Sequence, residues 1–111
     1  MNKPILFFVM MTVLTLAISE AAVYKGQRTF KKECVACHSN GQTFVVKYDT
    51  EYWENLMKNE GQSLREIHLK SQDAQDSKDY FNSKKYDRKV KHLKDFLIEY
   101  AKDSGNVPAC N

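Results

Sequence analysis

The stretch Gly26-Gln-Arg-Thr-Phe30-Lys-Lys-Glu-Cys34-Val-Ala-Cys37-His38 decides the fold of this 111-residue chain. Gly26, Phe30 and Cys34 stand at successive i+4 positions, and residues with that spacing share one face of an α-helix. A second thiol follows Cys34 at a spacing of about one helical turn, and the imidazole of His38 comes directly after it. The pattern predicts a helix that leads into a site of sulfur and imidazole chemistry.

The Cys-x-x-Cys-His arrangement is the pattern to which haem is covalently attached. Cys34 and Cys37 would form thioethers with the two vinyl groups of the porphyrin, because one helical turn matches their separation. His38 would then bind the iron as the proximal axial ligand. The sequence therefore predicts one covalent haem c, held by Cys34, Cys37 and His38.

Other chemistry is compatible with the same residues. A thioredoxin-type dithiol normally opens a helix after a buried strand, and residues 23–32 show no alternating apolar run. A zinc site needs four convergent ligands, so Cys34 and Cys37 would have to be joined by Cys110 and a histidine. Dithiol chemistry and a zinc-stabilised interaction module are therefore kept as alternatives to haem.

Residues 1–21 are typical of a cleaved signal peptide. Lys3 gives a short basic start, residues 5–18 are almost wholly apolar, and Ser19 and Ala21 suit a signal peptidase. The apolar run is shorter than the roughly 20 residues of a membrane-spanning helix, so an uncleaved anchor is the minor alternative. Because haem attachment takes place outside the cytoplasm, we expect an exported, periplasmic protein with no stable membrane span after signal removal.

Residues 22–111 are then one small domain. A domain of this length buries only roughly 60–65% of its unfolded surface and is marginally stable alone. An apolar porphyrin would supply the missing core, so we expect the haem-free chain to be largely unfolded or molten. The net charge of +3 is too mild to indicate a nucleic-acid-binding protein.

Apolar periodicity predicts an all-α fold with short connections. We expect helices over residues 25–32, from a cap at Thr50 to Gly61, and from a capping box at Ser63 and Glu66 through residue 69. Residues 43–47 are expected to stay extended, residues 71–77 to form a loop, and residues 80–81 to form a brief helical turn.

The longest helix is expected to start at a cap on Asp87, to run to about residue 103 and to stop at Gly105. Its predicted buried stripe consists of Val90, Leu93, Phe96, Leu97 and Tyr100. The first and last helices each carry one small apolar face, so they are expected to pack on each other. Gly26 would allow a close crossing of the two backbones.

These residues resemble the class I cytochromes c. That family has a glycine, an aromatic residue four positions later and the first haem cysteine four positions after that, as Gly26, Phe30 and Cys34 stand here. Leu97 and Tyr100 look like the family's apolar-x-x-aromatic pair, which crosses the N-terminal helix at the glycine. The resemblance implies a small monohaem domain whose terminal helices cross around the haem and which passes single electrons between larger redox proteins.

The chain departs from that family at the sixth iron ligand. The family usually supplies a methionine from a loop shortly before the C-terminal pair, and residues 81–85 contain neither methionine nor histidine. His68 is the favoured distal ligand, because an imidazole between Ile67 and Leu69 has an unusual apolar setting. Met57 is expected to fill the core, and His92 is expected to lie on the surface among lysines. Both remain candidates for the sixth ligand, and an open or water-bound iron is a further alternative.

Further features bear on the haem pocket and on partners. Tyr48, Tyr52 and Trp53 are expected to wall the pocket, with the Trp53 indole a candidate donor to a haem propionate. Cys110 is left unpaired, so it either joins a partner or a second copy through a disulfide or is a buried inert thiol. Basic residues crowd the last third of the chain: Lys78, Lys84, Lys85, Arg88, Lys89, Lys91 and Lys94. They form either a solvated helix face or a docking patch for acidic redox partners.

No acid–base pair or nucleophile arrangement indicates an enzyme. The sequence therefore predicts a monohaem c-type cytochrome that acts as a soluble one-electron carrier. The first alternative is a haem sensor or an oxidoreductase subunit with an exchangeable distal site.

Overall fold

The computed structural model describes residues 20–108, and these residues contain helices and no strand. The all-α prediction is therefore confirmed for this part of the chain. Residues 1–19, which hold most of the predicted signal peptide, and Cys110 lie outside the described residues. Among residues 20–108, no helix combines the length and the apolar character needed to cross a membrane.

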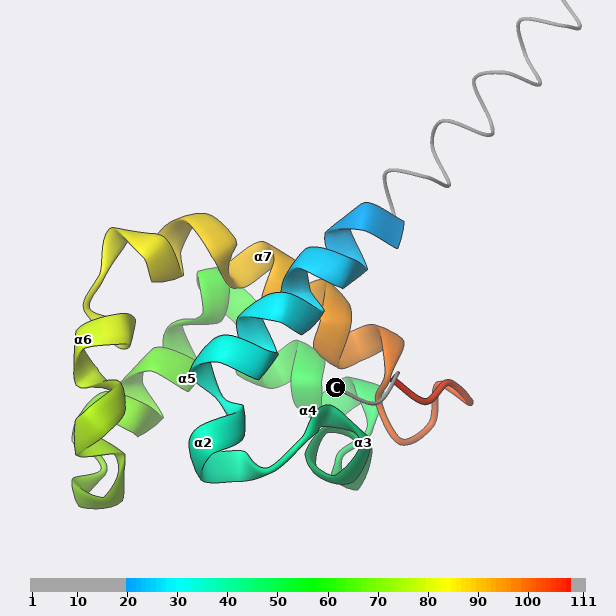
Figure 1. The fold of residues 1–111 in the computed structure, drawn as a ribbon, viewed down its shortest axis with the longest axis horizontal. Helices are drawn as coiled ribbons and strands as arrows, with labels where there is room; N and C mark the ends of the chain where they lie inside the picture. Colours follow the sequence, from blue (N-terminus) through cyan, green and yellow to red (C-terminus); the bar gives the residue numbers. More distant parts are fainter. Residues whose placement is uncertain (1–19, 109–111) are drawn as a thin grey trace, which may run out of the picture.

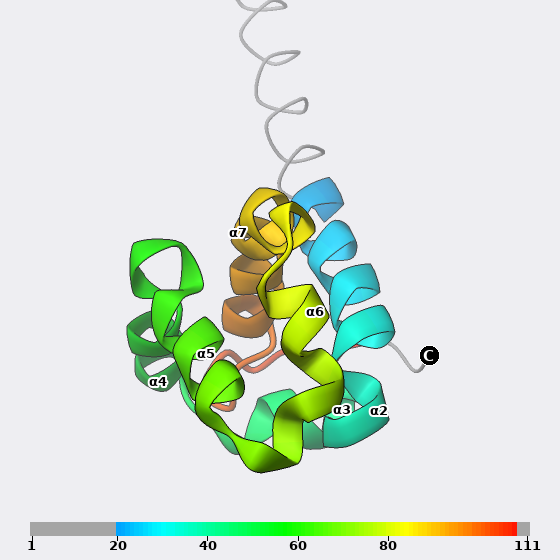
Figure 2. The ribbon, with the colours of Figure 1, turned by 90° about the vertical axis from the view of Figure 1, so that its left-hand side faces the viewer.

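The N-terminal helix covers residues 20–33 and leads directly into the Cys-x-x-Cys-His segment (Figure 1). The elements that follow are α2 (Val35–His38), α3 (Gly41–Phe44), the 3-10 helix η1 (Val45–Lys47), α4 (Thr50–Leu56), α5 (Lys58–Lys70), the 3-10 helix η2 (Gln72–Ser77), α6 (Lys78–Phe81) and α7 (Lys84–Glu99). Figure 2 shows the N-terminal helix beside α7, and in Figure 1 α6 lies at the opposite end of the domain from α3.

The N-terminal helix crosses α7 at Gly26. A Cβ on Gly26 would lie 2.7 Å from both the His92 carbonyl carbon and Phe96 Cβ, so only glycine allows the two backbones to come this close. The Phe30 and Phe96 rings then pack with centroids 5.4 Å apart. The predicted crossing is confirmed, but its partner on α7 is wrong: Gly26 meets the turn of His92 and Phe96, not Leu97 and Tyr100.

The hydrophobic core is built around one face of α7. Four of the five predicted stripe residues are buried, whereas Tyr100 is half-buried at the end of the helix. Tyr86 is fully buried and belongs to the same face, one turn before Val90. Burial of one large apolar side chain stabilises a fold by about 1.5–3 kcal/mol. The core is completed by Phe30, Val45, Trp53, Met57, Tyr80, Phe81 and Ala101.

Several predicted helix ends are wrong. Asp49, not Thr50, caps α4, and its Oδ1 accepts a hydrogen bond from the Tyr52 N–H at 2.8 Å. Thr50 instead donates its hydroxyl to Asp103 Oδ1 at 2.7 Å. Ser83, not Asp87, caps α7, which ends at Glu99 rather than near residue 103. In each case a capping side chain earlier in the sequence, one position before Thr50 and four positions before Asp87, satisfies a free N–H group of the first turn.

The connecting segments are more helical than expected. Residues 43–47 belong to α3 and η1 instead of being extended, because Asn40 Oδ1 accepts from both the N–H and the hydroxyl of Thr43 and caps α3. Residues 72–77 form η2 instead of a loop, and the brief turn over residues 80–81 is confirmed as α6. The second helix stops at Leu56, and in place of the capping box Gln62 donates to Glu66 across one turn of α5.

Candidate functional site

A largely apolar pocket lies between the Cys-x-x-Cys-His segment and the elements α4 to α7. Its volume of about 440 Å³ falls within the roughly 300–1,000 Å³ of small-molecule and cofactor sites. Apolar side chains supply most of its walls, including Phe30, Phe44, Trp53, Leu64, Phe81, Leu93 and Leu97. The pocket also contains Cys34, Cys37, His38 and His68. Four of the residues singled out for chemistry are therefore brought together.

The first pocket wall is one helical turn that starts at Cys34. The Cys34 carbonyl accepts from the N–H of Cys37 at 3.2 Å and from the N–H of His38 at 3.0 Å. Neither thiol forms a disulfide within residues 20–108; Cys34 is half-buried and Cys37 is exposed. Burial, followed by the charges of Glu33 and Cys37, raises the pKa of Cys34 to about 12. Because the thiolate is the reactive form, this protonated thiol is poorly suited to dithiol–disulfide exchange.

His38 and His68 face each other, with ring centroids 5.9 Å apart and ring planes at 81°. A metal ion between two imidazoles, each bound at about 2 Å, would separate the two ring centroids by roughly 6 Å. Burial lowers the pKa of His38, and the neighbouring His68 and Lys47 lower it further. His38 is thereby kept neutral, and the neutral imidazole is the form that binds metals.

The orientation of each imidazole is fixed by its neighbours. His68 Nδ1 lies 2.7 Å from the Leu64 carbonyl oxygen, so Nδ1–H donates, and Nε2 is the ring nitrogen left to bind a metal. A backbone carbonyl on the second ring nitrogen is the usual support for a metal-binding histidine. The His68 ring stacks on Phe81 with centroids 4.3 Å apart, and the His38 ring stacks on Phe44 at the same distance.

The other two candidate distal ligands do not reach the pocket. Met57 is 2% exposed and is packed in the core, as expected for a filler residue. His92 lies at the helix crossing, where its backbone meets Gly26. Its Nδ1 is buried without a hydrogen-bond partner in the described structure, so the surface position expected for it is only partly correct.

Tyr48, Tyr52 and Trp53 all line the pocket, as predicted. Tyr48 and Tyr52 stack with centroids 4.1 Å apart, and Tyr52 is exposed at the rim. The Trp53 indole N–H donates to the Val45 carbonyl at 3.1 Å. It is therefore engaged in the core and is not a free donor for a propionate.

Within residues 20–108, no group of three or more His, Cys, Asp or Glu side chains is placed to hold a metal ion. A zinc ion needs four such protein ligands, and the Cys110 required for that alternative lies outside this range. A haem iron needs at most two axial ligands from the protein, because the porphyrin supplies the others. The donor set of the pocket therefore fits a haem better than a bare metal ion.

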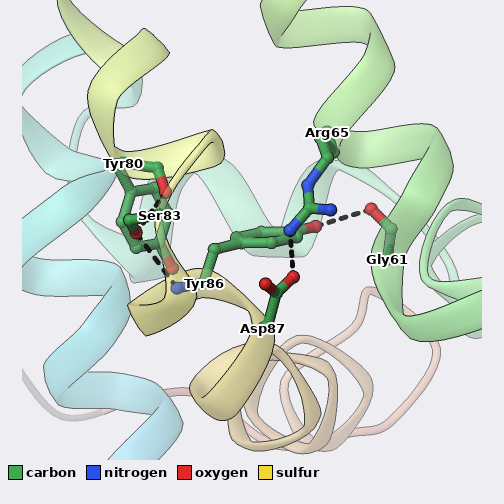
Figure 3. A network of polar contacts seen from close by, with 6 residues as sticks. All are labelled: Gly61, Arg65, Tyr80, Ser83, Tyr86 and Asp87. Atoms are coloured by element: carbon green, nitrogen blue, oxygen red, sulfur yellow. Dashed lines mark hydrogen bonds and ion pairs between the residues drawn. The ribbon is translucent and has the colours of Figure 1, made fainter.

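Sequence reasoning missed the residues that hold α5 in place. The predicted buried stripe of α7 did not include Tyr86, and no role was predicted for Arg65. Figure 3 shows both in one polar network with Gly61 and Asp87. The i+4 spacing of Tyr86 and Val90 was the available signal for the burial of Tyr86.

No protein-family model, no curated protein and no solved structure matches this chain. Its function therefore has to be inferred from the pocket and the side chains in it.

Proposed function

We propose that this protein is an exported monohaem c-type cytochrome that carries single electrons between larger redox proteins. The observation that carries the proposal is the pairing of His38 with His68 across an apolar pocket, beside the two thiols of Cys34 and Cys37. The two imidazole rings lie 5.9 Å apart, edge to face, and make no hydrogen bond to each other.

In this proposal Cys34 and Cys37 tether the haem and His38 and His68 are its axial ligands. The bound group would supply one-electron chemistry between ferric and ferrous iron. Burial keeps the Cys34 thiol protonated, which disfavours its oxidation to a disulfide before the haem is attached. The apolar surroundings of His38 lower its pKa and so favour the neutral imidazole that can bind the iron.

The ligand pair sets the expected properties of the carrier. Methionine as the sixth ligand raises the haem potential, so a second histidine gives a low-spin haem of lower potential. The orientation of His68 by the Leu64 carbonyl increases its basicity and strengthens this effect. Partners are proposed to be acidic redox proteins, because the exposed face of α7 carries Lys84, Arg88, Lys89 and Lys91.

Expression with a haem-attachment system tests the proposal. The purified protein should gain the mass of one haem and show the sharp absorption bands of a low-spin reduced cytochrome. Cys34→Ser with Cys37→Ser should abolish the covalent product, and His68→Ala should convert the haem to a high-spin or ligand-exchangeable form. A sulfur-to-iron charge-transfer band in the far red of the oxidised protein, or unchanged spectra in His68→Ala, would contradict His68 as the ligand.

A haem sensor or oxidoreductase subunit with an exchangeable distal site is the second candidate. Ile67, next to His68, is 55% exposed at the pocket, so a small ligand has a short route to the distal face. Carbon monoxide binding to the reduced wild-type protein distinguishes the two functions. A sealed carrier should bind it weakly, and a sensor should bind it readily.

A further inference from the structure

The start of α5 contains a kink over residues 59–61, which we call the junction, and its backbone is unusual. Asn59, Glu60 and Gly61 have φ values of 53°, 58° and 70°, so three consecutive residues lie in the left-handed region. Only glycine adopts this region without steric cost, and Asn59 and Glu60 need support from the surrounding structure. Gly61 is buried, and a Cβ on it would lie 2.6 Å from Val90 Cγ2. The junction is therefore pressed against α7 at one defined place.

Tyr86 holds this junction from α7. Its hydroxyl donates to the Gly61 carbonyl oxygen at 2.5 Å in a buried hydrogen bond (Figure 3). Burial raises the pKa of Tyr86 to about 12, so the hydroxyl remains a donor at physiological pH. A buried backbone carbonyl without a partner is costly, so loss of this hydrogen bond would favour other conformations of the junction.

Arg65 ties the next turn of α5 to the same end of α7. Its guanidinium lies over the Tyr86 ring, 4.6 Å from the centroid, and forms an ion pair with Asp87. Both partners stand in the first turn of α7, as Figure 3 shows. Tyr86 and Arg65 thus fasten α5 at two successive turns, and we name Gly61, Arg65, Tyr86 and Asp87 the α5 latch.

The α5 latch is continuous with the proposed distal ligand. His68 follows Arg65 by three residues on α5, hence by less than one turn. The His68 ring stacks on Phe81, and the Phe81 ring packs on Tyr86 with centroids 5.1 Å apart. Tyr86 therefore contacts both the junction that starts α5 and the aromatic ring that supports His68.

We propose that Tyr86 and Arg65 are positioning residues that keep His68 on the iron and thereby close the distal side to exogenous ligands. This inference rests on the proposed haem function. It predicts that exogenous ligands do not reach the iron of the wild-type protein, because the α5 latch holds His68 in the distal position. The pocket itself is open to solvent near Ile67. Weakening the α5 latch should convert a carrier into a protein that binds small ligands.

Carbon monoxide binding to the reduced, haem-loaded protein tests this role, because the haem stays covalently attached when the distal ligand is lost. Tyr86→Phe and Arg65→Gln should each increase the affinity for carbon monoxide about tenfold, the effect of losing one buried hydrogen bond or charged contact. Both should also raise the high-spin fraction of the oxidised protein. Tyr100→Phe is the matched control and should leave both readouts unchanged, because this half-buried tyrosine at the end of α7 lies outside the α5 latch.

The outcomes separate this inference from the proposed function. If the wild-type protein carries no haem, or if His68→Ala binds carbon monoxide no better than wild type, the proposed function fails. If His68→Ala binds carbon monoxide more tightly than wild type, but Tyr86→Phe and Arg65→Gln both keep the wild-type carbon monoxide affinity and high-spin fraction, the α5 latch has no positioning role. Should Tyr86→Phe fail to fold, Arg65→Gln decides the question, since Arg65 is partly exposed and its loss leaves the core intact.

Discussion

Replacing Gly26 by alanine tests the crossing that brings Cys34 to the pocket. The added Cβ would lie 2.7 Å from Phe96 Cβ and from the His92 carbonyl carbon, and neither atom is the end of a flexible side chain. It would also overlap the His92 carbonyl oxygen outright, so the two helix backbones must move apart before it fits. Overpacking costs about 1–3 kcal/mol, and more where backbone is involved, whereas alanine gains about 1 kcal/mol in helix propensity over glycine. We expect a net loss of about 2 kcal/mol in the free energy of unfolding.

Urea unfolding of the haem-loaded protein, followed by circular dichroism, measures this loss. Small domains have slopes of about 1–3 kcal/mol per molar urea, so the midpoint should fall by roughly 1 M. Gly41→Ala is the matched control, because its Cβ would meet the tip of the Phe96 ring at 3.0 Å and the Pro108 side chain at 3.5 Å. An unchanged midpoint in Gly26→Ala, or an equal fall in both variants, would refute the close crossing.

Three further predictions use the same unfolding assay. Tyr80→Phe should stabilise the protein by roughly 1–3 kcal/mol, because the buried Tyr80 hydroxyl has no hydrogen-bond partner among residues 20–108; a destabilised variant would reveal a partner. Asp49→Ala should cost about 1 kcal/mol by removing the cap of α4, and Asp49→Asn should retain most of it; equal losses in both would contradict the capping role. Hydrogen bonds from Thr50 hold the pKa of Asp103 below its usual 3.8. The stability that these hydrogen bonds give to the fold is therefore fully present above pH 3.8 and is lost as the pH falls through the lowered pKa. Asp103→Asn should therefore flatten the loss of stability in acid, and an unaltered pH profile would count against it.

The sequence predicted what depends on local periodicity. The i+4 series Gly26, Phe30 and Cys34 gave the face of the N-terminal helix that packs on α7, and the apolar stripe of α7 gave most of the core. The apolar setting of His68 also pointed to the pocket, where the structure places it. These features follow from a helix burying one face, which needs no knowledge of the partner.

What depends on tertiary contact could not be predicted. Residues 43–47 contain β-branched residues that favour a strand, but strand preference needs a neighbouring strand, and Asn40 offers a helix cap instead. The predicted contact of Gly26 on α7 was one helical turn too close to the C-terminus. Leu93 with Phe96 and Leu97 with Tyr100 have the same i+3 spacing, so the sequence does not distinguish the two pairs. The left-handed junction that ends at Gly61 depends on a hydrogen bond from Tyr86, which is distant in sequence.

Acid–acetone extraction of the purified, exported protein is the most direct test of the central claim. The account predicts a red chromophore that stays with the polypeptide, together with a mass that exceeds that of residues 22–111 by one haem. The Cys34→Ser, Cys37→Ser double variant should give up any haem that it binds. A colourless native protein, or one whose haem passes into the solvent, would contradict the account.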